Sequence, residues 1–321
     1  MNRRELLTTA GGLGAVFAMQ SLLSRTAAGA SLCGDDFEPQ AAAPLNTVKL
    51  TDTLSVVMGA GGNIAVLTGN EGVLQVDSGL PNRAADIAKS VADLSPRPVT
   101  TLINTHWHFD HTGGNEAVGK GGARIVAQTN TRARMGTDQT IEFMKMHSDP
   151  SPAIALPVIT FAESLTLYAN GEELFMTHVP PAHTDSDIVV YFRKANVLHA
   201  GDLLFNGFYP FIDYSSRGWI GGMVAGADLI LKLANANTKI IPGHGPMATR
   251  ADVTAFRDML HTIQARVEPM VKSGKTLQQV VESKPTRDFD AKWGMGFLTP
   301  DQFSTLAYTG IVRHRGMTGR A

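Results

Sequence analysis

The chain has 321 residues, of which 43% are hydrophobic and 18% are charged, and its formal net charge is −1. This length fits one large domain or two small ones, and the composition fits a soluble globular protein with a large core. There is no basic excess that would favour nucleic acid and no acidic block, so we expect a small-molecule substrate and no nucleic-acid partner. Oligomeric state is left open.

The N-terminus has the features of an export signal. Arg3 and Arg4 precede an apolar run over residues 10–23, and small residues at 28–30 offer a cleavage site. The paired arginines are typical of twin-arginine signals, so residues 1–30 are predicted to direct export to the bacterial periplasm or beyond. A membrane anchor is the alternative, but the run is interrupted and shorter than the ~20 apolar residues that a span needs. We therefore expect no stable membrane span after signal removal.

Residues 31–45 are predicted to form a flexible leader into the folded domain. This leader contains Cys33, the only cysteine, so no intramolecular disulfide can form. Three strands of an antiparallel meander are then predicted over 54–58, 63–67 and 72–77, separated by glycine-rich turns. Asp77 ends the third strand, either as a turn former or as a carboxylate that supports a metal ligand.

Apolar residues at helical spacing predict a helix over 81–94, and a β-branched run predicts a buried strand over 99–103. A cluster of histidine and aspartate follows directly, on a loop that ends with turn residues. Imidazole and carboxylate are ligands that Zn²⁺ and similar metals take. Their alternation can direct side chains at two neighbouring points, which suits two metals. The cluster consists of His106, His108, Asp110 and His111.

Between this cluster and the second half of the chain, residues 124–127 are predicted to form a strand. Residues 131–146 are predicted to be helical or a mobile flap, and His147 to be exposed in a loop. A hairpin with an Asn-Gly turn is expected over residues 165–179, with His178 inside its returning strand.

Three further candidate ligands each follow or end an apolar strand. They are His183 in Ala-His-Thr, Asp202 in Ala-Gly-Asp, and His244 in Pro-Gly-His-Gly. Each short motif by itself is also compatible with an ordinary turn. His199 falls inside a strand, so we interpret it as structural.

The hexapeptide at 106–111 resembles the HxHxDH signature of the metallo-β-lactamase superfamily, and the later motifs follow in that superfamily's order over roughly residues 46–250. The sequence alone supports an α/β mixture. The resemblance implies a four-layered αβ/βα sandwich of two mixed sheets with helices outside. The domain is expected to span residues 46–321, with C-terminal helices from about 250.

The resemblance also implies a ligand set for two zinc ions, with iron or manganese as alternatives. His106, His108 and His183 would bind one ion, while Asp110, His111 and His244 would bind the other. Asp202 would bridge both. In such a site a shared water loses its proton near neutral pH, and Asp110 would orient this nucleophile and shuttle its proton. Asp110 and Asp202 are therefore the expected catalytic carboxylates.

The function that this implies is hydrolysis of an ester, lactone or thioester, with an amide or β-lactam as a further possibility. Three alternatives remain. Zinc β-lactamases generally have Cys or Ser in the region of the bridging aspartate. A mononuclear iron dioxygenase of the persulfide type shares these ligands. A non-catalytic periplasmic metal-binding protein is the third, although an open two-metal site has no structural purpose.

Six aromatic residues lie within 205–219, and they are either a pocket wall or core around an irregular loop. Beyond them, Thr249, Thr276 and Thr299 are predicted to cap three helices, the last with proline at its first position. His261 and His314 are expected on the surfaces of these helices.

Overall fold

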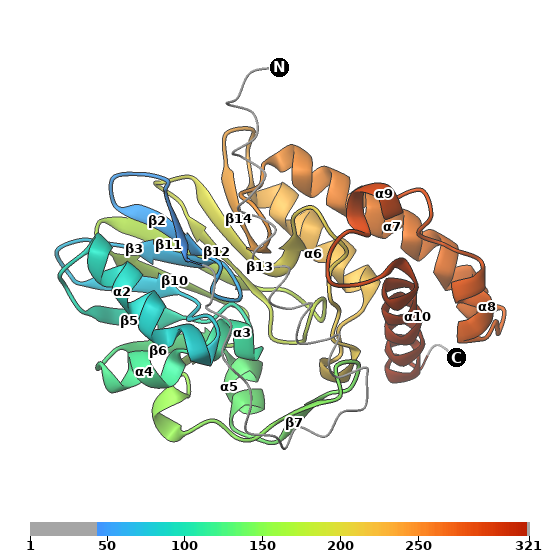
Figure 1. Cartoon of the computed structure of the whole chain (residues 1–321), viewed down its shortest axis with the longest axis horizontal. Coiled ribbons are helices and arrows are strands. Elements are labelled where there is room, and N and C mark those ends of the chain that lie inside the picture. Colours follow the sequence, from blue (N-terminus) through green and yellow to red (C-terminus); the bar gives the residue numbers. More distant parts are fainter. Residues whose placement is uncertain (1–43, 320–321) are drawn as a thin grey trace.

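The computed structural model describes residues 44–319, so the predicted export signal and residues 31–43 of the predicted leader lie outside the described residues. Two β-sheets lie at the centre, and helices cover their outer faces (Figure 1). None of the helices in the described range is both long and apolar enough to cross a membrane.

The first sheet has seven strands in the order β1-β2-β3-β4-β5-β6-β9 and is mixed. The predicted three-stranded antiparallel meander forms β2, β3 and β4, β1 adds a further antiparallel strand beside β2, and β4, β5, β6 and β9 then run parallel. The strands are β1 (Asn46–Lys49), β2 (Leu54–Met58), β3 (Ile64–Leu67), β4 (Val73–Val76), β5 (Val99–Ile103), β6 (Arg124–Gln128) and β9 (Ile159–Phe161).

The second sheet has five strands in the order β10-β11-β12-β13-β14. Its first four strands are antiparallel and include the predicted Asn-Gly hairpin, whereas β13 and β14 are parallel. The strands are β10 (Ser164–Ala169), β11 (Glu172–His178), β12 (Ile188–Phe192), β13 (Val197–Phe205) and β14 (Lys239–His244).

Alternation along the strands explains why the fold has four layers. In β2, Val56 belongs to a core cluster shared by both sheets, whereas its neighbour Val57 packs with Ile87 of helix α2 (Ala84–Leu94). Successive side chains of a strand point to opposite faces, so a strand that is apolar at both positions must be covered on both sides. The predicted sandwich of two mixed sheets with outer helices is confirmed.

The outer face of the second sheet is covered by helices from the C-terminal part of the chain. Helices α6 (Ile220–Leu233), α7 (Arg250–Lys272) and α10 (Pro300–Met317) share one large core cluster with β13. The predicted caps are confirmed, because Thr249, Thr276 and Thr299 each form a capping box. The remaining helices are short: α3 (Phe109–Thr112), α4 (Asn115–Lys120), α5 (Thr129–Met135), α8 (Leu277–Glu282) and α9 (Asp290–Trp293), with 3₁₀ turns at Pro81–Arg83, Ala153–Ala155 and Tyr214–Ser216.

Residues 131–146 contain both a helix and a hairpin. Helix α5 ends at Met135, and β7 (Gln139–Ile141) then pairs with β8 (Met146–Ser148). We call residues 139–148 the flap. His147 is exposed as predicted but lies in β8, so its placement in a loop was wrong. A two-stranded hairpin alone is marginally stable, and this one depends on contacts with distant parts of the chain that local sequence does not reveal.

Candidate metal centre

The seven predicted ligand residues meet at one edge of the two sheets. His106 and His108 follow β5, and His183 lies between β11 and β12. Asp202 lies within β13, and His244 ends the neighbouring parallel strand β14. The loops between strand ends therefore bring together residues that are up to 138 positions apart. Their donor atoms form two groups with all distances in a group within 4.8 Å, namely His106, His108 and His183, and Asp110, His111 and His244. A further group of His106, His111 and Asp202 links the two.

In the first group the ring nitrogens converge on a common point. Nε2 of His183 lies 2.8 Å from Nδ1 of His108, and Nε2 of His106 is buried with no hydrogen-bond partner among the described residues. An unpaired buried polar atom is costly unless something binds it. This arrangement fits a cation that accepts three imidazole lone pairs.

The outward nitrogen of each of these rings is hydrogen-bonded, which determines its tautomer. Nδ1 of His183 donates to the carbonyl oxygen of Phe211 at 2.8 Å. Nε2 of His108 lies 3.1 Å from the carboxylate of Asp213, which can only accept when ionised. Nδ1 of His106 lies 3.1 Å from the Thr105 hydroxyl oxygen. Partners of this kind leave the inward nitrogen free to bind metal, and they orient the ring.

The second group is built around Asp110 and His244. Nε2 of His244 lies 3.1 Å from Oδ2 of Asp110 and 3.3 Å from Nε2 of His111. On its other side, Nδ1 of His111 lies 2.7 Å from Oδ2 of Asp77. The carboxylate of Asp77 also accepts hydrogen bonds from the backbone and hydroxyl of Thr105. Asp77 therefore acts as a carboxylate that supports the candidate ligand His111, and not only as a turn former.

Asp202 lies between the two groups. Its Oδ2 is 3.4 Å from Nε2 of His183 and also 3.4 Å from Nε2 of His244, while Oδ1 is 3.0 Å from Nε2 of His111. The chain approaches very closely here, because a Cβ atom at Gly243 would lie 1.9 Å from the Asp202 carboxylate. The Gly in Pro-Gly-His is thus required by the site itself.

The electrostatics of the second group favour positive charge. Burial opposes protonation of His244, but Asp202 and Asp110 raise its pKa to about 9. Burial likewise opposes ionisation of Asp110, yet His111 and His244 hold its pKa at about 2. In the first group burial lowers the pKa of His183 to about 4. Neutral imidazoles and ionised carboxylates are the forms that bind metal, so His183 and Asp110 are ready to bind a divalent cation, whereas His244 must first lose its proton.

One residue beside the site has a strained backbone. Asp77 has a φ of 64°, in the left-handed region that residues other than glycine rarely adopt. Such strain persists where surrounding contacts compensate for it, and here the carboxylate makes three polar contacts. The strained conformation directs Asp77 at both Thr105 and His111.

The other histidines lie outside the two groups. Nε2 of His199 bonds to the carbonyl oxygen of Asn63, so its interpretation as structural is confirmed. His178 contacts the backbone of Asp185 from within β11. His261 is exposed, and His314 is half-buried with its ring stacked 3.7 Å from that of Trp219.

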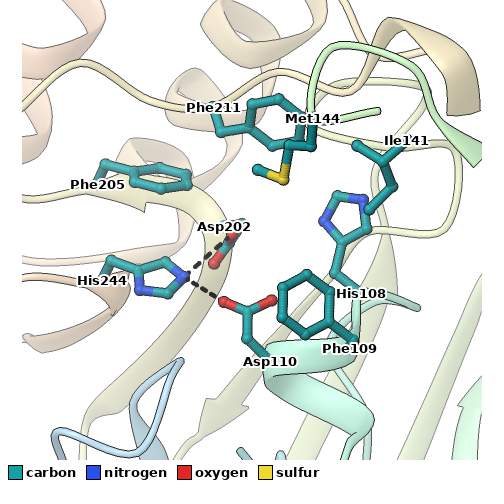
Figure 2. A pocket seen from close by; sticks show the side chains of 9 residues that line it. All are labelled: His108, Phe109, Asp110, Ile141, Met144, Asp202, Phe205, Phe211 and His244. Carbon is teal, nitrogen blue, oxygen red and sulfur yellow. Dashed lines mark ion pairs between the residues drawn. The ribbon is translucent and has the colours of Figure 1, made fainter. Parts of the chain in front are cut away.

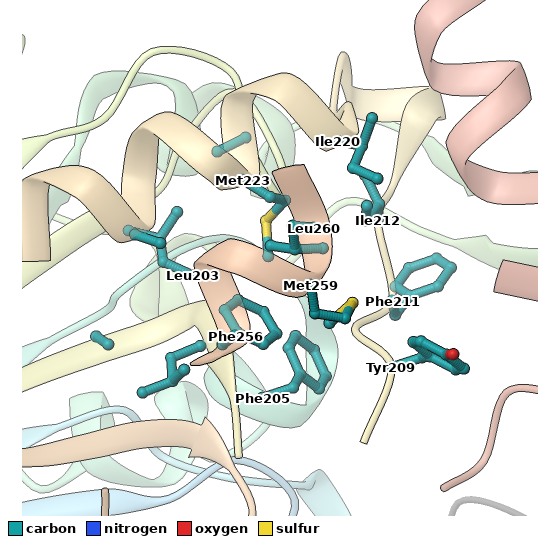
Figure 3. Packing of buried hydrophobic residues seen from close by; sticks show 14 of the residues in the cluster. Leu203, Phe205, Tyr209, Phe211, Ile212, Ile220, Met223, Phe256, Met259 and Leu260 are labelled. Atoms are coloured by element: carbon teal, nitrogen blue, oxygen red, sulfur yellow. The ribbon is translucent and has the colours of Figure 1, made fainter. Parts of the chain in front are cut away.

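The aromatic residues of 205–219 divide between pocket and core. Phe205 and Phe211 line a pocket above the candidate ligands (Figure 2). Tyr209 is instead part of the core, where its ring stacks on Phe303 at 4.6 Å, and Ile212 packs nearby with residues of α6 and α7 (Figure 3). The segment therefore contributes both to the pocket wall and to the core, through different residues.

Sequence reasoning missed Asp213. It lies in the same irregular segment, where its side chain also accepts a hydrogen bond from the backbone of Ser215. An aspartate with serines two and three residues later is typical of a local turn, and nothing in that pattern indicates a contact with His108. Only the fold brings the two residues together.

The profile of the metallo-beta-lactamase superfamily matches residues 58–256, more than half of the chain, and the protein belongs to this superfamily. The match and the buried clusters of histidine and aspartate together indicate an enzyme with a metal cofactor, in line with the hydrolases among its relatives.

Individual relatives are distant. The chain is 28% identical over 122 residues to the hydroxyacylglutathione hydrolase of Maricaulis maris (strain MCS10), a match over 38% of this chain and 40% of that enzyme. It is 27% identical over 251 residues to the 2,4-dinitroanisole O-demethylase subunit alpha of Nocardioides sp. (strain JS1661), over 75% of this chain and 70% of that protein. The inverting sec-alkylsulfatase from Pseudomonas sp. has a TM-score of 0.64 at 16% identity, over 91% of this chain and 54% of that one, which shows a shared fold.

Proposed function

We propose that the protein is a binuclear zinc-dependent hydrolase that cleaves an ester, lactone or thioester bond in a small molecule. The observation that carries this proposal is the position of Asp202, whose Oδ2 lies 3.4 Å from a histidine of each group. A carboxylate between two cation sites can hold both ions at a defined separation. The hydrolases among the relatives support the reaction class.

When bound, two zinc ions would supply a Lewis acid for the substrate carbonyl and would lower the pKa of a shared water towards neutrality. The chain's own residues prepare this chemistry. Asp110 lines the pocket with its ionised carboxylate, so it can orient the nucleophile and accept its proton. The fixed tautomers of His106, His108 and His183 keep three lone pairs directed inward without reorganisation.

The metal content of purified protein tests the binuclear assignment. Elemental analysis after reconstitution is expected to give about two zinc per chain. One iron per chain together with oxygen-dependent turnover would support the dioxygenase alternative instead. Two ions bound without turnover of any substrate would support a metal-binding protein.

A substrate panel tests the reaction. We expect kcat/KM for an aryl ester, a lactone or a thioester to exceed that for a β-lactam, each corrected for its uncatalysed hydrolysis. The panel also includes 2,4-dinitroanisole, because the 2,4-dinitroanisole O-demethylase subunit alpha matches 75% of this chain. Preference for the β-lactam would overturn the substrate class, and preference for the aryl ether would overturn the bond class.

A further inference from the structure

The pocket above the candidate ligands has an apolar wall. Apart from His108, Asp110, Asp202 and His244, its lining consists entirely of hydrophobic side chains, and no Lys or Arg of the described range lines it. About 250 Å³ of space lies among these side chains, part of it open to solvent. The hydrophobic residues are Phe109, Ile141, Met144, Phe205 and Phe211.

Two of these residues come from the flap. Figure 2 shows Ile141 and Met144 on the side of the pocket opposite Asp110. Ile141 is 1% exposed, and the adjacent Phe143 packs against Phe211 with ring centroids 6.0 Å apart. The flap therefore covers the site with hydrophobic side chains.

The flap is attached to distant segments. The backbone N–H of Glu142 donates to the hydroxyl of Ser215 at 3.1 Å, and Ser215 in turn donates to Asp213. The carboxylate of Glu142 accepts two hydrogen bonds, at 2.8 and 2.6 Å, from Arg313 of α10. These contacts keep Ile141 and Met144 in the pocket wall.

Two arginines near the flap are already paired with carboxylates. Arg313 is engaged by Glu142, and Arg134 makes two hydrogen bonds to the carboxylate of Asp185, at 2.6 and 2.7 Å. The lysine of the flap, Lys145, is exposed at its turn with a φ of 53°. A substrate anion that is not bound by the metals would thus be buried against hydrocarbon without a counter-charge, which is strongly unfavourable.

We propose that the site selects small uncharged substrates, whose apolar substituent lies against Ile141 and Met144, and rejects analogues in which that substituent carries a carboxylate, sulfate or phosphate. This inference rests on the proposed hydrolase function and names its substrate class. The flap is then the element that determines specificity.

A pair of nearly isosteric esters tests the selection. The zinc-loaded protein is assayed with 4-acetoxybenzamide and 4-acetoxybenzoate, each corrected for its uncatalysed rate. We expect kcat/KM to favour the amide by on the order of 10²-fold, because only the carboxylate must be desolvated without a partner. Equal values, or preference for the carboxylate, would overturn the inference.

Binding separates this inference from the proposed function. The dissociation constants of 4-carbamoylbenzohydroxamate and 4-carboxybenzohydroxamate are measured by calorimetry, because hydroxamates bind metal without being turned over. Tighter binding of the neutral compound, with no hydrolysis of any ester, lactone or thioester, would retain the inference and refute the hydrolase. Equal binding would refute the inference whatever the activity.

Variants of the flap identify the residues responsible. Met144→Arg should reduce or reverse the preference for the neutral compounds, whereas Met144→Gln, a polar control without charge, should not favour the carboxylate. Lys145→Asn should leave the ratio unchanged, since asparagine tolerates the left-handed turn. If the ratio of kcat/KM values for the neutral and carboxylate esters is unchanged in a folded, zinc-loaded Met144→Arg variant, Met144 does not determine specificity. If Lys145→Asn instead binds 4-carboxybenzohydroxamate more weakly than wild type does, Lys145 acts as a counter-charge at the site and the inference is wrong.

Discussion

The carboxylate of Asp213 lies 3.1 Å from Nε2 of His108, although the two residues are 105 positions apart. Burial opposes ionisation of Asp213, but His108, Ser215 and Ser216 keep its pKa below the ordinary value. The carboxylate therefore accepts a hydrogen bond from Nε2–H of His108, and Nδ1 of His108 is left with its lone pair facing His183. Asp213 is a positioning residue for a candidate metal ligand.

Loss of Asp213 should weaken one metal site. Partners of metal-binding histidines typically contribute ~10–100-fold in affinity. We expect Asp213→Ala to lower the affinity of the first group by that amount and Asp213→Asn by less, with the second group little changed. Competition with a chromophoric chelator measures both affinities. Asp93→Asn, at an exposed carboxylate of α2, is the matched control, and wild-type affinities in Asp213→Ala would contradict the role.

Metal binding should displace protons from His244. With a pKa raised to about 9 from an ordinary 6.5, its charge stabilises the metal-free folded state fully below pH 6.5. This stabilisation is lost as the pH rises through about 9. At pH 7.5 zinc binding should therefore release protons, as measured by calorimetry in two buffers of different ionisation enthalpy. His244→Ala should release fewer protons and lose occupancy of one site. Unchanged zinc content in this variant would contradict its assignment as a ligand.

Arg313 should affect the pocket more than overall stability. Arg313 and Glu142 are 40% and 45% exposed, and such exposed ion pairs contribute only ~0.2–1 kcal/mol to unfolding. Arg313→Gln is therefore expected to lower Tm slightly, while a less ordered flap raises KM several-fold at unchanged zinc affinity. Arg315→Gln, on the same helix, provides the comparison. Equal KM values for the two variants would show that the ion pair does not position the flap.

The predicted export signal lies outside the residues that the structure describes. We propose that the mature protein begins near Ser31 in the periplasm. The double substitution Arg3→Lys with Arg4→Lys should then leave the precursor in the cytoplasm, as cell fractionation and N-terminal sequencing would show. Normal processing of the double variant would refute the twin-arginine route without refuting export itself.

Most candidate ligands could be predicted because they follow or end an apolar strand, and His183 is recognisable in this way even though its motif is short. Asp202 instead lies within β13, and the order of the motifs, with Asp202 between His183 and His244, made it a candidate. The three capped helices could also be predicted, because their signals are confined to four residues. Local signals of this kind survive because the cap is satisfied within its own helix turn.

What could not be predicted depends on tertiary contacts. Asp213 resembles an ordinary turn residue, and its contact with His108 exists only after both sheets have assembled. Residues 139–148 form a flap because Glu142 reaches Ser215 and Arg313, which are 73 and 171 positions away. Local propensity carries no information about such partners, so the pocket wall at Ile141 and Met144 became visible only in the structure.

The most direct test of the two-metal hydrolase is the activity of an Asp202 variant. We measure kcat/KM for an aryl ester with zinc-reconstituted wild type and Asp202→Ala, after circular dichroism has shown that the variant is folded. Loss of well-placed electrostatic stabilisation costs on the order of 10²–10³ in rate, so a decrease of at least that size is predicted. Activity of Asp202→Ala close to that of wild type would contradict a carboxylate shared by two metals.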